Sequence, residues 1–356
     1  MRKLLVILIL ISILFGINLQ VSAQKKYQGE EFMVYLGIQP NHREDVMSYI
    51  APRLKEKFGI ELIAEEMGSS TQIQKLNLMR DKPTISINGM DTPVAVQAND
   101  MGLLEVIDPE KAPNIKDLFD WTIERDDEGI KVLAYSISPI GLIYNEEMFE
   151  RNGWEPPDSW EDLWRDELSG LISITSPEST YGLCSLVALA KIAGGGEDNI
   201  QPGIEKVKSL MPHMHTVHTW SSELVKLLQL NEVALATTAA VQGTALRADG
   251  FPARWVAPKE LTPVQFGGVS LVKNAPYQDV AYEYLNIYFS TEFQLIRARS
   301  GAVSTNKNVW DKLSEEELSE MPIQPKDFDK LTTLDWSTVN RNKNEWIEKF
   351  QREISK

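Results

Sequence analysis

The strongest constraint on the fold is a regular alternation of short apolar strands with helices. Residues 31–36, 60–64 and 84–87 have the composition of strands, whereas 45–58 and 72–80 carry apolar residues at helical spacing. Short polar loops at 68–71 and 88–92 follow two of these strands. Such an order predicts an α/β fold with mainly parallel sheets, which bind ligands at the carboxyl ends of their strands.

The same alternation resumes in the second half of the chain. Residues 131–136 lead into 138–145, which is typical of a strand that crosses between lobes, and 171–175 and 269–272 indicate further strands. Helices are expected over 183–192, 280–289 and 345–354, and Ser159 with Asp162 forms the pattern of a capping box. A chain of 356 residues is long enough for two cores.

The N-terminus has the pattern of an export signal. Arg2 and Lys3 precede an uncharged apolar run over 4–21, and small residues surround Ala23. We predict a signal peptide over 1–23, cleaved after Ala23, and a periplasmic or extracellular protein. An uncleaved anchor is the alternative, because the run approaches the roughly 18–20 residues that span a bilayer. The only cysteine is Cys184, so we expect no lipid anchor at the cleavage site.

Charge and composition narrow the classes of partner. The formal net charge is −15, which disfavours nucleic acid and anionic lipid as partners. Cys184 lies in an apolar helical stretch, where a buried, inert thiol is expected. We find no nucleophile elbow and no zinc-protease motif, so we expect no enzyme and no cofactor. A secreted hydrolase with a pair of carboxylates remains an alternative.

Several short motifs occur in a fixed order along the chain. They are Gly-Leu-Leu at 102–104, Gly-Leu-Ile-Tyr-Asn at 141–145, Pro-Asp-Ser-Trp-Glu-Asp-Leu at 157–163, Phe-Gly-Gly-Val-Ser-Leu-Val-Lys-Asn-Ala at 266–275, Ala-Tyr-Glu-Tyr-Leu at 281–285 and Gly-Ala-Val-Ser-Thr-Asn at 301–306. In this order the chain resembles the solute-binding proteins of ABC importers, in the branch of polyamine, ferric-iron and thiamine binders.

The resemblance implies a type 2 periplasmic-binding-protein fold, in which two α/β lobes joined by hinge strands close on a solute. It further implies delivery of the solute to an ABC permease complex in the membrane, and we expect a monomer. We assign 24–136 to the first lobe, 137–265 to the second, 266–303 to a return into the first, and 304–356 to C-terminal helices mostly on the second lobe. A protein that reports its ligand to a membrane receptor is the alternative role.

Departures from the family bear on the ligand. Ser176 and Ser179 stand where the polyamine binders carry carboxylates, and Phe266 and Gly268 stand at their tryptophan-and-aspartate pair. An ammonium group buried without such partners is costly. The ferric binders use two adjacent tyrosines as ligands, and this sequence has none. A polyamine or metal-ion binder of the same family therefore stays an alternative, and the sequence favours a small polar solute that is anionic or zwitterionic.

The predicted ligand-binding residues are hydroxyl groups and a few other side chains in the expected cleft loops. Two hydroxyl clusters begin helices, at Gln72 and Tyr181, where free amides favour an anion, although serine and threonine are also common helix caps. Asp91 could bind a cation or cap the helix that starts at Thr92, and Trp220 and Trp255 could stack on a ligand. The full set is Ser69, Ser70, Thr71, Asp91, Ser136, Ser138, Ser176, Ser179, Thr180, Trp220, Thr237, Thr238, Phe266 and Gly267.

Three of the four histidines lie together, at His213, His215 and His218. Residues two apart on a strand share a face, so His213 and His215 could share a metal ion. No carboxylate or cysteine stands beside them at a suitable spacing, and the segment has the composition of an exposed edge. We therefore assign no metal site. Gly194, Gly195 and Gly196 follow a helix, which indicates a helix end and not a phosphate loop.

Overall fold

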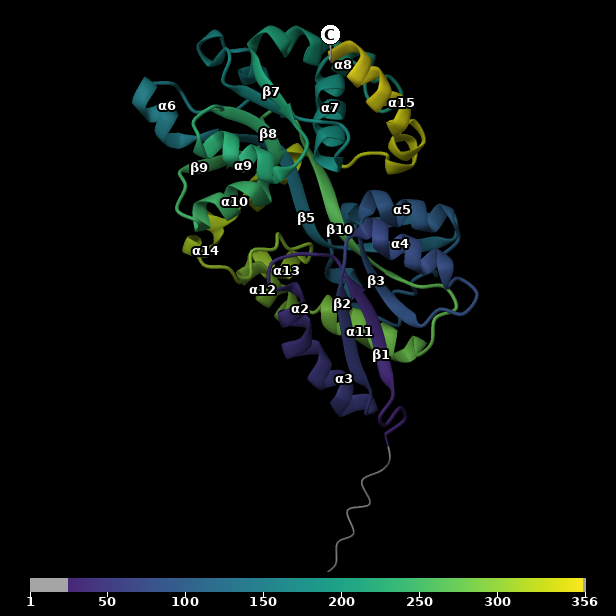
Figure 1. Cartoon of the computed structure of the whole chain (residues 1–356). Coiled ribbons are helices and arrows are strands. Elements are labelled where there is room, and N and C mark those ends of the chain that lie inside the picture. The colour runs from purple at the N-terminus through teal and green to yellow at the C-terminus, as the bar shows by residue number, and fades with distance from the viewer. Residues whose placement is uncertain (1–24, 355–356) are drawn as a thin grey trace, which may run out of the picture.

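Two long strands run through both halves of the molecule and join its lobes (Figure 1). The structure is a computed structural model that describes residues 25–354. Strand β5 (Gly129–Asn145) pairs antiparallel with β10 (Thr262–Leu271) over 133–139 and with β8 (Leu235–Ala239) over 140–144. A single strand therefore leaves one sheet and enters the next near Pro139. This confirms the predicted crossing strand.

The sheet of the first lobe holds the N-terminal strands. Its order is β2 (Glu61–Glu66), β1 (Glu31–Leu36), β3 (Ile85–Asp91), β10 and β5, with β4 (Ile123–Asp126) on the outer edge of β5. Strand β1 runs parallel to β2 and β3, whereas β10 is antiparallel to β3 and β5. The parallel strands are those that the sequence predicted at 31–36, 60–64 and 84–87. Strand β3 extends to Asp91, so residues 88–91 are strand and not the predicted loop.

The sheet of the second lobe continues from β5 through β8 to β6 (Ile172–Thr175) and β7 (Met214–His218), with β9 (Ala253–Val256) also on β5. Strand β6 is parallel to β7 and β8. A short strand, β11 (Leu331–Thr332), pairs with the start of β10. The predicted two-lobed α/β class is confirmed. Each sheet is mixed and not mainly parallel, because the crossing strands β5 and β10 are antiparallel to their neighbours, apart from the short strand β11.

Helices cover both sheets and enclose separate cores. Around the first sheet lie α2 (His42–Asp45), α3 (Ala51–Phe58), α4 (Ser69–Leu78), α5 (Thr92–Asp100) and α11 (Gln278–Tyr288). Around the second lie α6 (Glu146–Asn152), α7 (Thr180–Ile192), α8 (Gln201–Leu210), α9 (Ser221–Gln229) and α10 (Ala240–Ala248). Cys184 is fully buried in α7, as expected, and Trp160 is also fully buried. Within residues 25–354, no helix has both the length and the apolar character to cross a membrane. The predicted signal peptide lies outside the described residues.

The C-terminal part follows α12 (Thr291–Arg299), α13 (Lys307–Trp310) and α14 (Glu315–Glu320) and ends in α15 (Trp336–Ile354). Helix α15 lies beside α7 and α8 (Figure 1), and Trp346 and Phe350 pack into the core of the second lobe. It also touches the first lobe, because the Asn340 side-chain amide donates to the Pro93 carbonyl (2.7 Å). The residue bounds of the two lobes remain a prediction.

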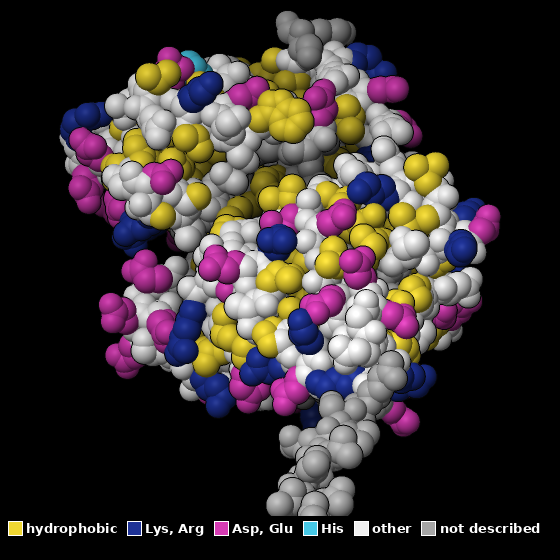
Figure 2. Space-filling view, turned by 60° about the horizontal axis from the view of Figure 1, so that its bottom comes forward, with side chains coloured by type: hydrophobic (Ala, Val, Ile, Leu, Met, Phe, Trp, Pro, Cys, Tyr) yellow, Lys and Arg dark blue, Asp and Glu magenta, His cyan; other side chains and the backbone are white. Residues whose placement is uncertain are grey.

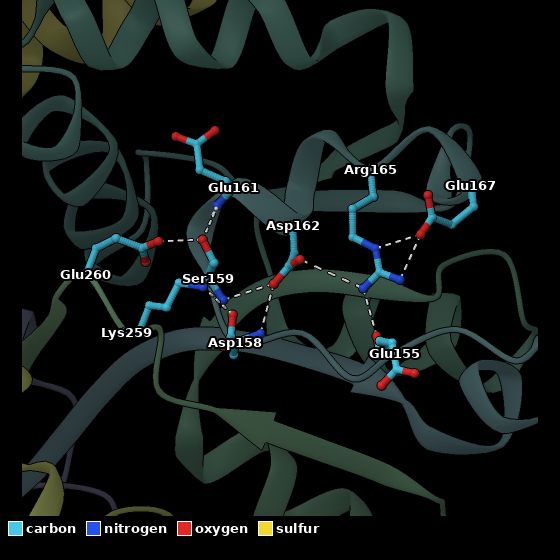
Figure 3. Close-up of polar contacts among 9 residues, drawn as sticks. All are labelled: Glu155, Asp158, Ser159, Glu161, Asp162, Arg165, Glu167, Lys259 and Glu260. Atoms are coloured by element: carbon cyan, nitrogen blue, oxygen red, sulfur yellow. Dashed lines mark hydrogen bonds and ion pairs between the residues drawn. The ribbon is translucent and has the colours of Figure 1, made fainter.

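A polar cluster fixes the loop that precedes β6 (Figure 3). The Ser159 hydroxyl accepts from the Glu161 amide (3.0 Å), and the Asp162 carboxylate accepts from the Ser159 amide (2.9 Å), so the predicted capping box is confirmed. The Ser159 hydroxyl also donates to the carboxylate of Glu260. Since Glu260 comes two residues before β10, these bonds tie the loop to the start of a crossing strand.

Candidate functional site

A cleft of about 570 Å³ lies between the two lobes. The first lobe contributes the loop after β1, the end of β3, and the α12–α13 connection, while the second contributes the starts of α7, α9 and α10. The crossing strands β5 and β10 supply the remaining walls. The surface is hollowed between the lobes in the space-filling view, and hydrophobic side chains gather along the hollow (Figure 2).

Strand register brings four polar residues to the cleft. Asp91 at the end of β3 stands opposite Gly267 on β10, and Gly267 stands opposite Ser136 on β5. Two residues along, Gln265 stands opposite Ser138. Because alternate residues of a strand share a face, Ser136 and Ser138 reach the same side of the sheet. All except Gly267 line the cleft.

Asp91 holds the N-cap position of α5, but its carboxylate makes no hydrogen bond to the helix amides. Instead, the Ser69 hydroxyl donates to Asp91 Oδ2 (3.2 Å) and accepts from the Asp91 amide (3.0 Å). Burial raises the pKa of the Asp91 carboxyl, while hydrogen bonds from Ser69 and Gln265 act in the opposite direction. The side chain is therefore presented to the cleft, and the predicted capping bond is not formed.

Gln265 is the second unusual polar group in the cleft. Its side chain is 5% exposed, and its Oε1 has no hydrogen-bond partner within residues 25–354. A buried amide oxygen without a donor costs free energy. Because Gln265 lines the cleft, its Oε1 is available to accept a hydrogen bond from a bound solute.

The second lobe presents helix starts to the cleft. Ser179 caps α7 by accepting from the Gly182 amide (3.1 Å), so the cap does not occupy the amides of Thr180 and Tyr181. The start of α10, at Ala240 and Val241, lines the cleft and has no side-chain cap. Free amides and the positive end of a helix dipole favour a negatively charged group.

Tyr181 of the second lobe and Asp91 of the first lobe line the same cleft. Burial, followed by the nearby charge of Asp91, raises the pKa of Tyr181 to about 12. Asp91 belongs to the first lobe and Tyr181 to the first turn of α7. The carboxylate and the α7 helix start therefore face one pocket.

Arg297 also lines the cleft, but its charge is already paired. Its Nη1 lies 2.6 Å from Asp45 Oδ2, and its side chain is 2% exposed. It also donates to the Pro40 carbonyl (3.2 Å) and to Gln39 Oε1 (3.0 Å). Gln39 in turn donates to the Ser136 hydroxyl (2.7 Å). This network fixes the loop after β1 against the crossing strand.

Exposed apolar side chains stand at the cleft. Ile38 of the first lobe is 72% exposed, and Trp220 and Val241 of the second are 66% and 39% exposed. Exposed apolar groups that gather at one place indicate an interaction site. They can contact the apolar part of a solute or each other when the lobes close.

The remaining predicted residues do not line the cleft. Ser70 and Thr71 are exposed on the first turn of α4, and Ser69 acts through its bonds to Asp91. Ser176, Phe266 and Gly267 pack elsewhere: Ser176 lines a separate groove against α15, Phe266 is 1% exposed in a core, and Gly267 contacts the Tyr135 ring. The lining residues among the predicted set are Asp91, Ser136, Ser138, Ser179, Thr180 and Trp220.

Thr237 and Thr238 belong to a buried network behind the cleft. Thr237 Oγ1 accepts from the Thr175 amide (2.8 Å), and Thr175 Oγ1 lies 3.1 Å from His218 Nε2. Burial lowers the pKa of His218 to about 4. Trp255 is buried as well, and its indole donates to the Thr238 carbonyl (3.1 Å). Thr237, Thr238 and Trp255 therefore stabilise the second lobe and do not line the cleft.

His215 and His218 have different surroundings. His218 points into the core, whereas His215 lies 3.7 Å from the Glu232 carboxylate at the surface. Within residues 25–354, no group of three or more metal-ligand side chains is found. The sequence analysis did not predict several polar residues that line the cleft, namely Gln39, Tyr181, Thr219, Ser221, Thr244, Gln265, Arg297 and Ser300.

Two lobes, two crossing strands and a polar cleft between them define the class of two-lobed ligand-binding proteins. The profile of the bacterial extracellular solute-binding protein family matches residues 49–323. The chain belongs to this family of ABC-importer binding proteins, whose members act in the periplasm or outside the cell.

Solved structures share this fold. The chain is similar to an ABC transporter protein from Clostridium perfringens, with 26% identity, a TM-score of 0.77 and coverage of 91% of this chain and 99% of that one. A spermidine/putrescine substrate-binding protein from Streptococcus pneumoniae has a TM-score of 0.74 at 18% identity, over 91% and 100% of the chains. An uncharacterized protein of Haemophilus influenzae is 26% identical over 69% of this chain and 70% of its own length.

Proposed function

We propose that this protein captures a small polar solute, anionic or zwitterionic, between its lobes and delivers it to an ABC permease in the membrane. The main support for the proposal is that α7 and α10 both begin at the cleft. Each helix start has backbone amides that no side-chain cap occupies, so these amides can bind an anionic group. The proposal includes the export signal, a monomeric protein, and lobes with the bounds predicted above. No catalytic residue is assigned.

The charges of the cleft argue against a polyamine as the solute. A polyamine carries two or more ammonium groups, and each needs an acidic partner when it is buried. Among the residues that line the cleft, Asp91 is the only carboxylate, and Arg297 is a cation. Spermidine and putrescine should therefore bind weakly.

A thermal-shift screen tests this function. The panel holds phosphonates, phosphorylated metabolites, organic acids, amino acids and polyamines. A solute that binds only the folded protein stabilises it by about 2.7 kcal/mol at a hundredfold excess over Kd. We expect a compound from the anionic or zwitterionic groups to raise the melting temperature, and calorimetry to give a one-to-one complex.

Two results would count against the proposal. Stabilisation by polyamines alone would show that the charge argument is wrong. Chemical conversion of a hit without a stable complex would make the protein an enzyme. Matched buffer samples at equal ionic strength serve as the control, since salt alone changes stability.

A further inference from the structure

We propose that the solute carries a protonated amine in addition to its anionic group, and that Asp91 and Gln265 of the crossing region bind this amine. The inference rests on the proposed function and names the class of solute for the same cleft. It assigns the amine to the polar groups at the end of β3 and on the crossing strands, and the anionic group to the helix starts of the second lobe. The solute would therefore bridge the lobes through opposite charges.

Around Asp91, one buried acceptor has no hydrogen-bond donor within the described residues. The Asp91 carboxylate accepts a hydrogen bond from the Ser69 hydroxyl (3.2 Å) and one from the side chain of Gln265. Gln265 Oε1 is buried and receives no donor within the described chain. Ser138 on β5 pairs with Gln265 on β10 in the strand register. An ammonium group has three donors and no acceptor, so it matches this set.

The charge of the pocket points the same way. Arg297 is neutralised by Asp45, so the free charge at the cleft is the negative charge of Asp91. A purely anionic solute would meet this charge as a repulsion. An amine beside Asp91 removes the repulsion and adds a charge-assisted hydrogen bond.

A metal ion fits this set of groups less well than an amine. Hard divalent cations take about six to eight oxygen ligands and favour several carboxylates. The cleft lining provides one carboxylate, Asp91, and the described residues contain no cluster of three metal-ligand side chains.

The second lobe completes the pocket for the anionic group. Tyr181, in the first turn of α7, lines the same cleft as Asp91. The amides of Thr180 and Tyr181 are at the same helix start. A short solute with both charges can therefore contact the two groups at once.

Matched pairs of probes test the amine directly. 2-Aminoethylphosphonate is compared with ethylphosphonate, 4-aminobutyrate with butyrate, and putrescine represents an amine without an anionic group. Because a hydrogen bond to a charged group contributes strongly, we expect the amine to tighten Kd about 10- to 100-fold within a pair. Putrescine should bind more weakly than the zwitterions.

The Asp91→Asn variant distinguishes charge recognition from a structural role. The aminated probe should lose about 10- to 100-fold in Kd, whereas its deaminated partner should bind the variant as well as, or better than, the wild type. The melting temperature of the solute-free variant should be unchanged or higher, because a buried carboxylate is replaced by a neutral group. Asp158→Asn, at a surface ion pair with Lys259, is the matched control and should change none of these values.

The possible failures are distinguishable. Equal binding of both members of a pair, or unchanged affinity of Asp91→Asn for the aminated probe, would overturn the amine assignment and leave the solute-binding function intact. Binding of metal ions or putrescine in preference to all zwitterions would also overturn it. If no compound of the wider panel stabilises the protein, both the inference and the proposed function fail.

Discussion

Replacing Gly182 with alanine should destabilise the protein by about 3 kcal/mol or more, measured as the free energy of unfolding in urea. A Cβ at this position would lie 1.9 Å from the Ser176 carbonyl oxygen and 2.2 Å from its carbon. Both are backbone atoms, so no side-chain rotation relieves the clash. The loss outweighs the roughly 1 kcal/mol by which alanine is the better helix former.

The consequence reaches the cleft, because the segment from Ser176 to Thr180 would have to move. Ser179 and Thr180 line the cleft from this segment. Gly68→Ala is the control: no atom lies within 4 Å of its Cβ, and its φ of −64° suits any residue. Its effect should stay within about 1 kcal/mol. A Gly182→Ala protein as stable as the control would contradict the packing described here.

Removing the partner of Arg297 should be the other large effect. We expect Asp45→Ala to cost about 3–5 kcal/mol in the free energy of unfolding, because it leaves a buried guanidinium without a counter-charge. The side chains of Arg297 and Asp45 are 2% and 13% exposed, and their atoms lie 2.6 Å apart. The remaining partners, the Pro40 carbonyl and Gln39 Oε1, are neutral.

Two variants separate this effect from a general loss of a carboxylate. Asp120→Ala breaks an exposed ion pair, in which the side chains of Arg125 and Asp120 are 41% and 87% exposed. It should cost a small fraction of the Asp45 value. Combining Asp45→Leu with Arg297→Met should recover most of the loss, since no charge then remains buried. A double variant no more stable than Asp45→Ala would mean that the ion pair is not the cause.

The positions of many strands and helices can be predicted from the sequence, because the hydrophobic patterns that specify them are local. Strand β1 has the predicted bounds, and Gly59 ends the first long helix with φ of +78°, as glycine readily does. The sequence predicts the crossing strand β5 from the apolar residues of 131–136 and 138–145. These features depend on neighbours along the chain.

The site is harder to predict from the sequence than the fold. It depends on which face of a strand a residue occupies and on contacts between residues far apart in the chain. The resemblance predicts Phe266 as a ligand-binding residue, but its neighbour Gln265 lines the cleft and Phe266 is buried in a core. Successive residues of a strand point to opposite faces of the sheet, so a shift of one residue exchanges the cleft side for the core side. Thr237 and Thr238 are buried in β8, while the next turn, at Ala240 and Val241, reaches the cleft. Arg297 and Asp45 are 252 residues apart in the chain, so no local pattern pairs them.

The measurement that tests the central claim most directly is the radius of gyration of the protein, from X-ray scattering with and without a saturating solute found in the screen. If the solute is held between the lobes, contacts to Asp91 and to the start of α7 draw them together, and the radius of gyration should fall. Calorimetry on the same samples establishes saturation. An unchanged radius of gyration at saturation would contradict binding by closure of the cleft.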